Sequence, residues 1–378
     1  MKVKVIANYL PQFHRIPEND LWWGEGYTDW MAVKSAKPIL EGQYQPKIPL
    51  NNNYYDLSDI TNIRWQTELA KKYGVYGFAI YHYWFNAQQK LLEKPAEIIL
   101  KNKDIDIHYM FIWDNVSWKR TWSRIKGNDW SPVYDKKTNQ DSPCDEGSCC
   151  QGDGVLARLD LGTEKDWKQH FDYLLPFFRD QRYIKIDGKP MIGFMSLVQN
   201  YEILLKMTEY WDKLAKSCGY PGIVCMNHEN WRGKNLQKTF RYSLEQPYTL
   251  FAAIKNKFNK MLYTHLNKIR VYDYDELWQK ALKSASSSGS NVYLCGQVNY
   301  DDTARRGEKG HLILGASPDK FKRYFKELLE ISGQQGKEFL FCVAWNEWAE
   351  GMYLEPDTLY GYGYLDALKA ALIETNNY

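Results

Sequence analysis

The sequence predicts an α/β fold, a single (β/α)8 TIM barrel with long loops at the C-terminal face of its strands. Apolar, β-branched and aromatic runs alternate with amphipathic helical patterns, as in a parallel sheet built from βα units. Eight such runs are present, and no Gly-x-Gly-x-x-Gly sequence follows the first of them. A closed barrel is therefore favoured over a doubly wound dinucleotide-binding sheet.

The expected strands are apolar runs bounded by polar or turn residues. They are residues 3–10, 77–84, 108–114, 190–196, 222–228, 241–246, 291–300 and 338–348. The clearest helical patterns are at residues 63–73, 201–217, 275–284, 318–331 and 365–374.

The length of 378 residues lies within the roughly 250 to 400 that parallel barrels use as one unit. Residues 1–378 are therefore expected to form one catalytic domain. Two stretches, near 11–59 and 119–163, are too long for ordinary connections. We interpret them as loop insertions at the face where barrel enzymes build their sites.

The bulk composition excludes several classes of protein. The chain is 44% hydrophobic and 25% charged, as in ordinary globular proteins, and its net charge of +3 includes no long basic run. Nucleic-acid binding is therefore disfavoured. No window reaches the roughly 18 apolar residues of a membrane span, and the amino-terminal run is too short for a signal segment. We expect a soluble, cytoplasmic protein with no integral membrane segment.

Cysteine usage fits a reducing compartment. Cys218, Cys225, Cys295 and Cys342 are four of the seven cysteines and lie in apolar or strand-like contexts expected of buried thiols. The other three, Cys144, Cys149 and Cys150, share one polar segment and could hold zinc only with a fourth ligand from elsewhere. We expect no metal and no cofactor.

Aromatic residues are unusually frequent. The chain has 15 Trp and 29 Tyr, and aromatics make up 16% of the residues. A flat apolar ring with a polar edge suits a pyranose, so an oligo- or polysaccharide ligand is favoured. An aromatic-rich core is the alternative reading of any single one of these residues.

Two glutamates near the C-terminus are the candidate catalytic pair. Glu347 and Glu350 follow the apolar run 339–344, so the last strand should deliver them to the mouth of the barrel. Cleavage of a glycosidic bond needs one carboxyl group that protonates the leaving oxygen and a second that supplies or activates the nucleophile. Taken alone, Glu-x-x-Glu is more often a solvated helix edge.

Other expected strand ends also combine aromatic and polar residues. The second strand ends in Tyr81, His82, Tyr83 and Trp84. Because side chains alternate along a strand, about half of these strand-end residues should pack instead of facing the site. His82 could be a core histidine. Arg305 and Arg306 could bind an acidic group or pair with Asp301 or Asp302.

These residues resemble a known family, the WbsX-type proteins of bacterial surface-polysaccharide clusters, which are similar to glycoside hydrolase family 99. The matching stretches are 9–14 (YLPQFH), 19–24 (NDLWWG), 44–46 (YQP), 81–85 (YHYWF), 187–190 (DGKP) and 345–356 (WNEWAEGMYLEP).

The resemblance implies a retaining barrel enzyme that cleaves α-mannosidic linkages without a metal or cofactor. It gives Glu347 the role of the base that deprotonates the sugar's 2-hydroxyl, and Glu350 the role of acid and then base. Strand ends and matching stretches together predict substrate contacts from Trp22, Trp23, His82, Tyr83, Trp84, Trp113, Asn115, Trp118, Asp301, Arg305, Arg306, Trp345, Asn346, Tyr353 and Glu355.

The chain departs from the family pattern at one acid. Relatives have Asn-Glu-Asn-Trp where this chain has Asn115, Val116, Ser117 and Trp118. If that glutamate contacts substrate in relatives, this chain takes another sugar or has lost activity. The Arg pair survives at Arg305 and Arg306.

Three functions therefore remain open. The first is a glycoside hydrolase or transglycosylase acting on an α-linked surface glycan. The second is a glycosyltransferase of O-antigen, lipopolysaccharide or capsule biosynthesis, and the third is a non-catalytic glycan-binding barrel. The sequence leaves open whether the reaction is hydrolysis or transfer and whether it acts within the glycan or at its ends. It also leaves open which sugar is recognised and the oligomeric state.

Overall fold

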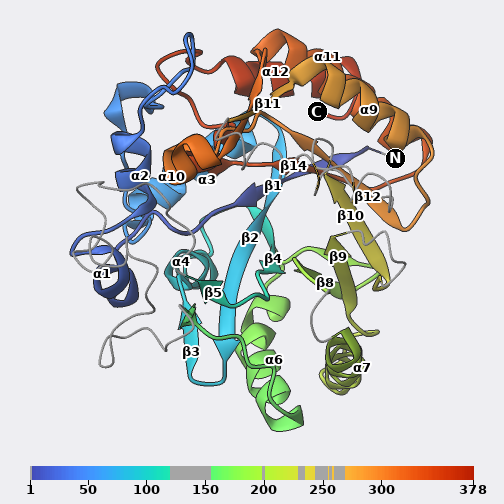
Figure 1. Cartoon of the computed structure of the whole chain (residues 1–378). Coiled ribbons are helices and arrows are strands. Elements are labelled where there is room, and N and C mark those ends of the chain that lie inside the picture. Colours follow the sequence, from blue (N-terminus) through green and yellow to red (C-terminus); the bar gives the residue numbers. More distant parts are fainter. Residues whose placement is uncertain are drawn as a thin grey trace.

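The computed structural model describes residues 2–119, 155–197, 201–228, 235–242, 254, 258 and 269–378. Eight strands of this described part form one closed parallel ring, in which each pairs with the next along the chain and the last pairs with the first (Figure 1). The predicted (β/α)8 barrel is thus confirmed. Its strands are β1 (Lys4–Tyr9), β2 (Val75–Asn86), β4 (His108–Trp113), β8 (Lys189–Phe194), β9 (Val224–His228), β10 (Lys238–Tyr242), β12 (Val292–Gln297) and β14 (Phe339–Val343).

Long helices surround the ring, and the predicted ones are present. The helix predicted at 201–217 has those bounds in the structure, whereas α4 and α6 lie outside the predicted ranges. The outer helices are α3 (Ile60–Lys72), α4 (Lys94–Lys101), α6 (Glu164–Arg179), α7 (Tyr201–Ser217), α9 (Tyr274–Ser286), α11 (Pro318–Gln334) and α12 (Gly363–Glu374).

Short elements complete the described chain. They are the helices α1 (Pro17–Trp23), α2 (Asp29–Ser35) and α10 (Thr303–Arg306), the 3-10 turns η1 (Leu50–Asn52), η3 (Gly307–Lys309) and η4 (Trp348–Glu350), and the strands β3 (Gln89–Leu91), β5 (Trp118–Lys119), β6 (Val155–Ala157), β7 (Lys185–Ile186), β11 (Arg270–Asp273), β13 (His311–Leu314), β15 (Asn346–Glu347) and β16 (Met352–Tyr353).

Two strand predictions are corrected. The sixth strand begins at Lys238, earlier than the predicted 241, and residues 243–246 of the prediction lie outside the described residues. The last predicted strand, 338–348, ends as β14 at Val343 and continues into the antiparallel hairpin β15/β16. The reason is that Trp345 N donates to Asn8 O at 2.7 Å, and Leu10 N donates to Asn346 Oδ1 at 2.7 Å. These loop contacts take the place of the strand ladder after Val343.

The first loop insertion is more regular than predicted. Between residues 11 and 59 the chain forms α1, α2 and η1. Helices of seven residues are too short to show a helical period in sequence. They bury Trp22, Trp23 and Trp30 over the mouth-side loops. Of the second insertion, 155–163 are described, and the predictions for Cys144, Cys149 and Cys150 lie outside the described residues.

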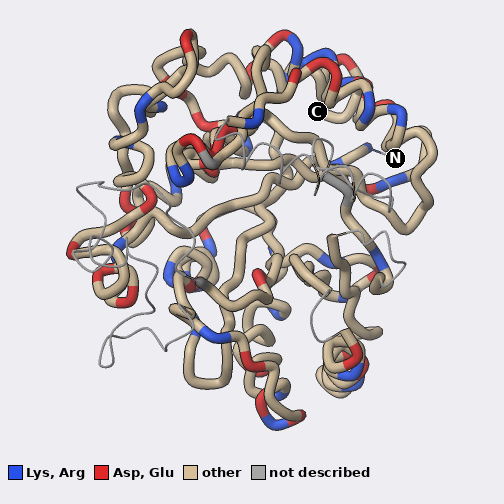
Figure 2. The backbone as a smooth tube through the Cα atoms, in the orientation of Figure 1, with Lys and Arg blue, Asp and Glu red and all other residues tan. Residues whose placement is uncertain are grey.

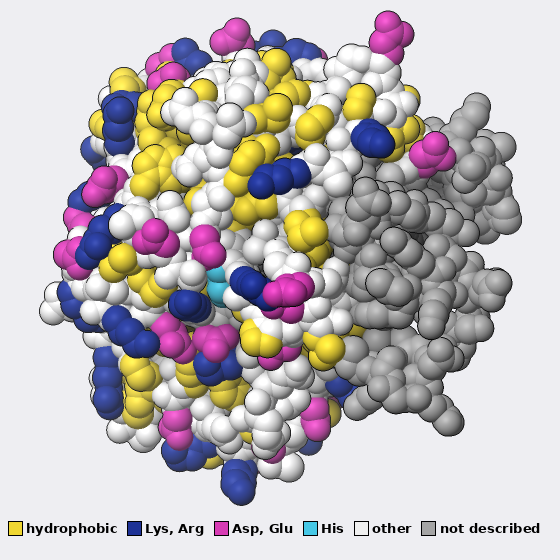
Figure 3. Space-filling view, turned by 90° about the vertical axis from the view of Figure 1, so that its left-hand side faces the viewer, with side chains coloured by type: hydrophobic (Ala, Val, Ile, Leu, Met, Phe, Trp, Pro, Cys, Tyr) yellow, Lys and Arg dark blue, Asp and Glu magenta, His cyan; other side chains and the backbone are white. Residues whose placement is uncertain are grey.

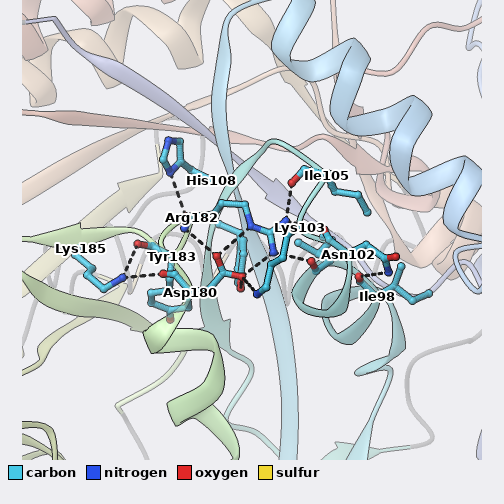
Figure 4. A network of polar contacts seen from close by, with 11 residues as sticks. Ile98, Asn102, Lys103, Ile105, His108, Asp180, Arg182, Tyr183 and Lys185 are labelled. Carbon is cyan, nitrogen blue, oxygen red and sulfur yellow. Dashed lines mark hydrogen bonds and ion pairs between the residues drawn. The ribbon is translucent and has the colours of Figure 1, made fainter. Parts of the chain in front are cut away.

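A polar network fastens the barrel floor, at the N-terminal ends of the strands (Figure 4). The guanidinium of Arg182 donates to the carbonyls of Ile99, Asn102 and Ile105 at 2.7, 3.0 and 2.6 Å, and it pairs with Asp180 at 2.6 Å. A cation at the C-terminal end of α4 also complements the helix dipole. The network thereby joins the end of α4 to the segment that precedes β7.

Charged residues lie on the helices and loops around the ring, with both signs interspersed (Figure 2). Among the described helices, none has the length and apolar character needed to cross a bilayer. Cys225, Cys295 and Cys342 are free and buried as predicted. Cys218 is exposed, contrary to the prediction, because it follows the last turn of α7.

Candidate active site

A cavity of about 210 Å³ lies at the C-terminal ends of the barrel strands, the face where barrel enzymes build their sites. It is smaller than the roughly 300 to 1,000 Å³ of sites that enclose drug-sized ligands, which suits one sugar ring. Residues following six strands line it: Leu10, Gln12, Tyr81, Tyr83, Asp114, Met195, Gln297, Arg305, Val343, Glu347, Glu350 and Met352.

Glu347 is the more buried of the two predicted catalytic carboxyls. It lies in β15, paired with Met352 of β16, and is 6% exposed. Burial raises the pKa of Glu347 well above its ordinary value, and the neighbouring carboxylate of Glu350 raises it further, while Arg305 opposes the shift. The ligand-free cavity therefore favours a proton on Glu347.

Glu350 sits in the η4 turn and has a different charge environment. Arg305 Nη1 lies 2.5 Å from Glu350 Oε1, and the same guanidinium donates through Nη2 to Asp29 Oδ2 at 2.8 Å. Asp29 belongs to α2 and is fully buried. One arginine thus joins the first loop insertion to the catalytic turn, and it places a positive charge against Glu350.

A third carboxyl lines the same cavity. Asp114 follows β4, and its backbone N–H donates to His82 O at 3.0 Å. Burial raises the pKa of Asp114 to about 6, although a hydrogen bond with Trp118 lowers it in part. Beside it, Tyr83 accepts a hydrogen bond from Gln12 at 3.2 Å. Several polar groups therefore converge on the space beside Glu347.

Three residues predicted to contact substrate, His82, Trp84 and Trp113, are not among the residues that line the cavity. In β2, Tyr81 and Tyr83 point into the cavity, so His82 and Trp84 point outward. His82 Nε2 lies 2.8 Å from His170 Nε2 of α6, and Trp84 stacks on the His170 ring with centroids 4.4 Å apart. Burial lowers the pKa of His82 to about 3, as in a neutral core histidine. Trp113 also packs in this layer, and its indole donates to Trp84 O.

Four other predicted contacts lie behind or beside the cavity wall. Trp118 packs edge-on to Tyr83 at 4.9 Å, and Trp22 packs edge-on to Trp118 at 6.1 Å. Trp23 is buried against Tyr27. Asn115 exchanges two hydrogen bonds with Ser196, joining the ends of β4 and β8. The structure gives these residues a supporting position.

The remaining residues of the last motif hold the β15/β16 hairpin in place. Asn346 bonds both backbone groups of Leu10, and Trp345 is buried against Phe78. Tyr353 stacks on Trp348 with centroids 3.9 Å apart. Glu355 accepts hydrogen bonds from three groups, namely Tyr55 Oη at 2.8 Å, Gln66 Nε2 at 2.7 Å and Trp348 Nε1 at 2.7 Å.

The two predicted arginines separate. Arg305 lines the cavity, whereas Arg306 pairs with Asp302 at 3.2 Å and is directed away from it. Asp301 is also structural, because it pairs with Lys47 at 2.9 Å and accepts from Gln43 and Gln45. The alternative reading of a salt bridge is therefore confirmed for Arg306.

Sequence reasoning left several cavity residues out of the predicted contacts. Asp114 could have been found from its position at the end of a predicted strand. Asp29, which binds Arg305 beside the cavity, could not be identified from the sequence, because it lies 276 positions from that arginine. The omitted lining residues are Leu10, Gln12, Tyr81, Asp114, Met195, Gln297, Val343 and Met352.

Known structures share this fold at low sequence identity. The GH99 endo-alpha-mannosidase from Bacteroides thetaiotaomicron matches with a TM-score of 0.52 and 12% identity, covering 98% of this chain and 97% of that one. A structure described as a glycoside hydrolase-like protein matches with a TM-score of 0.55 and 12% identity, covering 98% and 94%. These likenesses show the barrel fold.

Sequence relatives extend over nearly the whole chain. The Xanthomonas campestris pv. campestris (strain B100) protein described as "Uncharacterized protein WxcX" is 27% identical over 376 residues, 97% of this chain and 49% of its own length. The chain thus spans about half the length of the curated relatives it matches. The family described as "Glycosyltransferase WbsX" matches residues 5–142 and 149–368. The chain belongs to this WbsX family.

Proposed function

We propose that the chain is a carbohydrate-active enzyme that cleaves or transfers an α-glycosidic, mannoside-like linkage of a bacterial surface polysaccharide. The reaction would retain configuration and use Glu347 and Glu350. One observation carries the proposal: both carboxyls lie in one cavity at the mouth of the barrel, Glu347 buried and Glu350 partly exposed and paired with Arg305. Two carboxyls in unlike environments are what acid and base roles require.

The proposed reaction assigns each carboxyl one proton transfer. In the roles implied by the family resemblance, Glu347 accepts the proton of the sugar's 2-hydroxyl, that oxygen forms a bond to the anomeric carbon, and Glu350 protonates the leaving oxygen. Water then opens the intermediate and restores both groups. Burial favours the proton on Glu347 in the ligand-free cavity. Binding of the substrate must therefore shift the proton toward Glu350 before cleavage.

Leaving-group dependence tests these roles. A leaving group with a low pKa needs little protonation, so a variant without the acid keeps much of its activity on an activated aryl glycoside. We expect Glu350→Gln to recover on such a substrate and Glu347→Gln to stay inactive. The reverse pattern would assign the acid to Glu347. Full activity of both variants on the polysaccharide would reject the mechanism.

Transfer is the second candidate activity, and the description of the family as a glycosyltransferase favours it. The same two carboxyls can pass the sugar to an acceptor hydroxyl instead of water. Mass spectrometry of the products, with and without an added acceptor oligosaccharide, separates the two. Nucleotide-sugar binding measured by calorimetry would favour a conventional transferase.

Loss of the family acid at Val116 does not argue strongly for a non-catalytic barrel. Val116 is 36% exposed and is not among the cavity residues, whereas Asp114 supplies a carboxyl to the cavity two positions earlier. We propose that Asp114 supplies the acidic group of the site from a different position, and that the site therefore binds a different sugar.

A further inference from the structure

A second cavity, of about 190 Å³, lies behind the wall that carries the catalytic pair. The hairpin β15/β16 separates the two spaces. Met352 faces the first cavity, whereas Gly351 and Tyr353 face the second. Lys47 and Asp301 pack closely against Gly351, because a Cβ atom built there would approach Lys47 Cε at 3.0 Å and Asp301 Cβ at 3.1 Å.

Three loops from the mouth of the barrel enclose this second cavity. The segment between α2 and α3, drawn in blue, runs beside the red segment before α12 (Figure 1). Leu50 N donates to Pro356 O, and Thr358 N donates to Ile48 O, at 2.9 Å each. The residues that follow β13 close the third side. The second cavity is thus a built space between packed segments.

The polar groups that line the second cavity can bind hydroxyl groups of a ligand. Lys47 is 4% exposed, and its ammonium donates a hydrogen bond to Asp301 Oδ2 at 2.9 Å. Among the described residues, Asn299 Oδ1 is buried without a hydrogen-bond partner. An ammonium offers three donors, and a buried orphan acceptor is costly. A ligand that both accepts and donates would satisfy these groups.

The full charges in the second cavity already have partners. Lys47 pairs with Asp301, and Asp357 accepts from the Tyr353 hydroxyl at 2.7 Å and from the backbone N–H groups of Leu359 and Tyr360. A charged ligand would meet no free counter-charge among these groups. The chemistry therefore favours a neutral ligand.

Aromatic rings supply the flat surfaces. Tyr353, Tyr360 and Tyr364 line the second cavity, and Tyr360 and Leu359 remain 38% and 49% exposed at its rim. Hydrophobic side chains gather in the upper part of the face drawn in Figure 3, which carries these loops. Rings with a polar edge suit the C–H faces and hydroxyls of a pyranose.

We propose that the second cavity binds a neutral saccharide unit, as a carbohydrate-binding site distinct from the catalytic cavity. Its hydroxyls would donate to Asn299 Oδ1 and accept from Lys47 Nζ, while one ring face packs on Tyr360. None of these groups belongs to the catalytic pair. Loss of the proposed reaction would therefore leave this binding intact.

The test titrates D-mannose, D-glucose and D-galactose into the full chain carrying Glu347→Gln, observed by saturation-transfer NMR and calorimetry. Tyr360→Ala should weaken binding of at least one of these sugars by about tenfold, because a ring contact and its buried area are lost. Tyr362→Ala removes an equally exposed tyrosine, 39%, that does not line the cavity, and should leave the affinity unchanged.

Asn299→Leu is the second variant and removes the orphan acceptor without altering the rim. It should also weaken binding, and a crystal soaked with the bound sugar should show it against Tyr360 in the parent and not in either variant. The proposal is overturned if none of the three sugars binds, or if neither substitution changes the affinity while thermal unfolding shows both variants folded.

Discussion

Arg305 forms a 2.5 Å ion pair with Glu350, and through this arginine the first loop insertion reaches the site. The other end of the same guanidinium holds Asp29 of α2 at 2.8 Å. The η4 turn that carries Glu350 is thus joined through Arg305 to a helix that lies far from it in sequence. Fixed side chains of this kind hold reacting groups close to their productive geometry.

Removal of either catalytic carboxyl should abolish most of the activity. We expect Glu347→Gln and Glu350→Gln each to lower kcat/KM on the polysaccharide by at least ~10²-fold, since acid and base assistance supply that much. Glu374→Gln, on the exposed end of α12, is the matched control and should keep its rate. Wild-type turnover by either site variant would exclude that residue from catalysis.

Removal of Arg305 should destabilise the fold as well as the site. Arg305→Met leaves the fully buried Asp29 without its cation, and breaking such a pair costs about 3 to 5 kcal/mol of unfolding free energy. The double variant with Asp29→Asn should regain part of this loss. Urea unfolding measures both. As a control, Arg64→Met breaks the exposed pair with Asp104 and should change stability by less than about 1 kcal/mol.

The pH profile should respond to Asp114. Burial, Glu350 and then the charges of Asp29 and Asp114 raise the pKa of Glu347. Activity should fall on the alkaline side as the pair loses its single proton. Asp114→Asn removes one negative charge, lowers the pKa of Glu347 and should move that limb to lower pH. The exposed Asp172→Asn, on α6, should leave the limb in place. An unchanged limb in Asp114→Asn would mean that its charge does not reach the pair.

Stability against pH should depend on Glu355. Burial raises its pKa from 4.5 to about 7, although hydrogen bonds from Trp348, Gln66 and Tyr55 lower it in part. A raised folded pKa means that the protonated form is favoured in the native state. The contribution is therefore complete below about pH 4.5 and is lost as the pH rises toward 7, by roughly 3 kcal/mol. Glu355→Gln should flatten the change in urea midpoint between pH 5 and 7. A slope equal to that of the parent would assign the titration to another group.

Most of the barrel could be predicted from sequence, because strands and long helices have distinct periods over many residues. Which face of β2 points inward could not be predicted. Strands of a parallel barrel are buried on both sides, so Tyr81 and Tyr83 look as apolar and aromatic as His82 and Trp84. Only the three-dimensional packing of His82 against His170 separates them.

The sequence brought together the candidate residues that are neighbours along the chain, and it missed the contacts between distant segments. Glu347 and Glu350 share one short motif with the apolar run that presents them. The contacts of Arg305 with Asp29 and of Lys47 with Asp301 join residues more than 250 positions apart. No local sequence pattern indicates such a pairing. The ion pairs around the cavity could therefore be identified only in the structure.

The hairpin β15/β16 lies between the first and the second cavity, and its successive side chains face one cavity and then the other. The number of residues in the hairpin is therefore critical. Insertion of a single residue after Gly351 would reverse the sides, sending a tyrosine ring toward the catalytic carboxyls and separating Asp357 from the Tyr353 hydroxyl. Chains of this kind that retain both compartments must therefore keep the spacing of this turn constant, even where the residues themselves change.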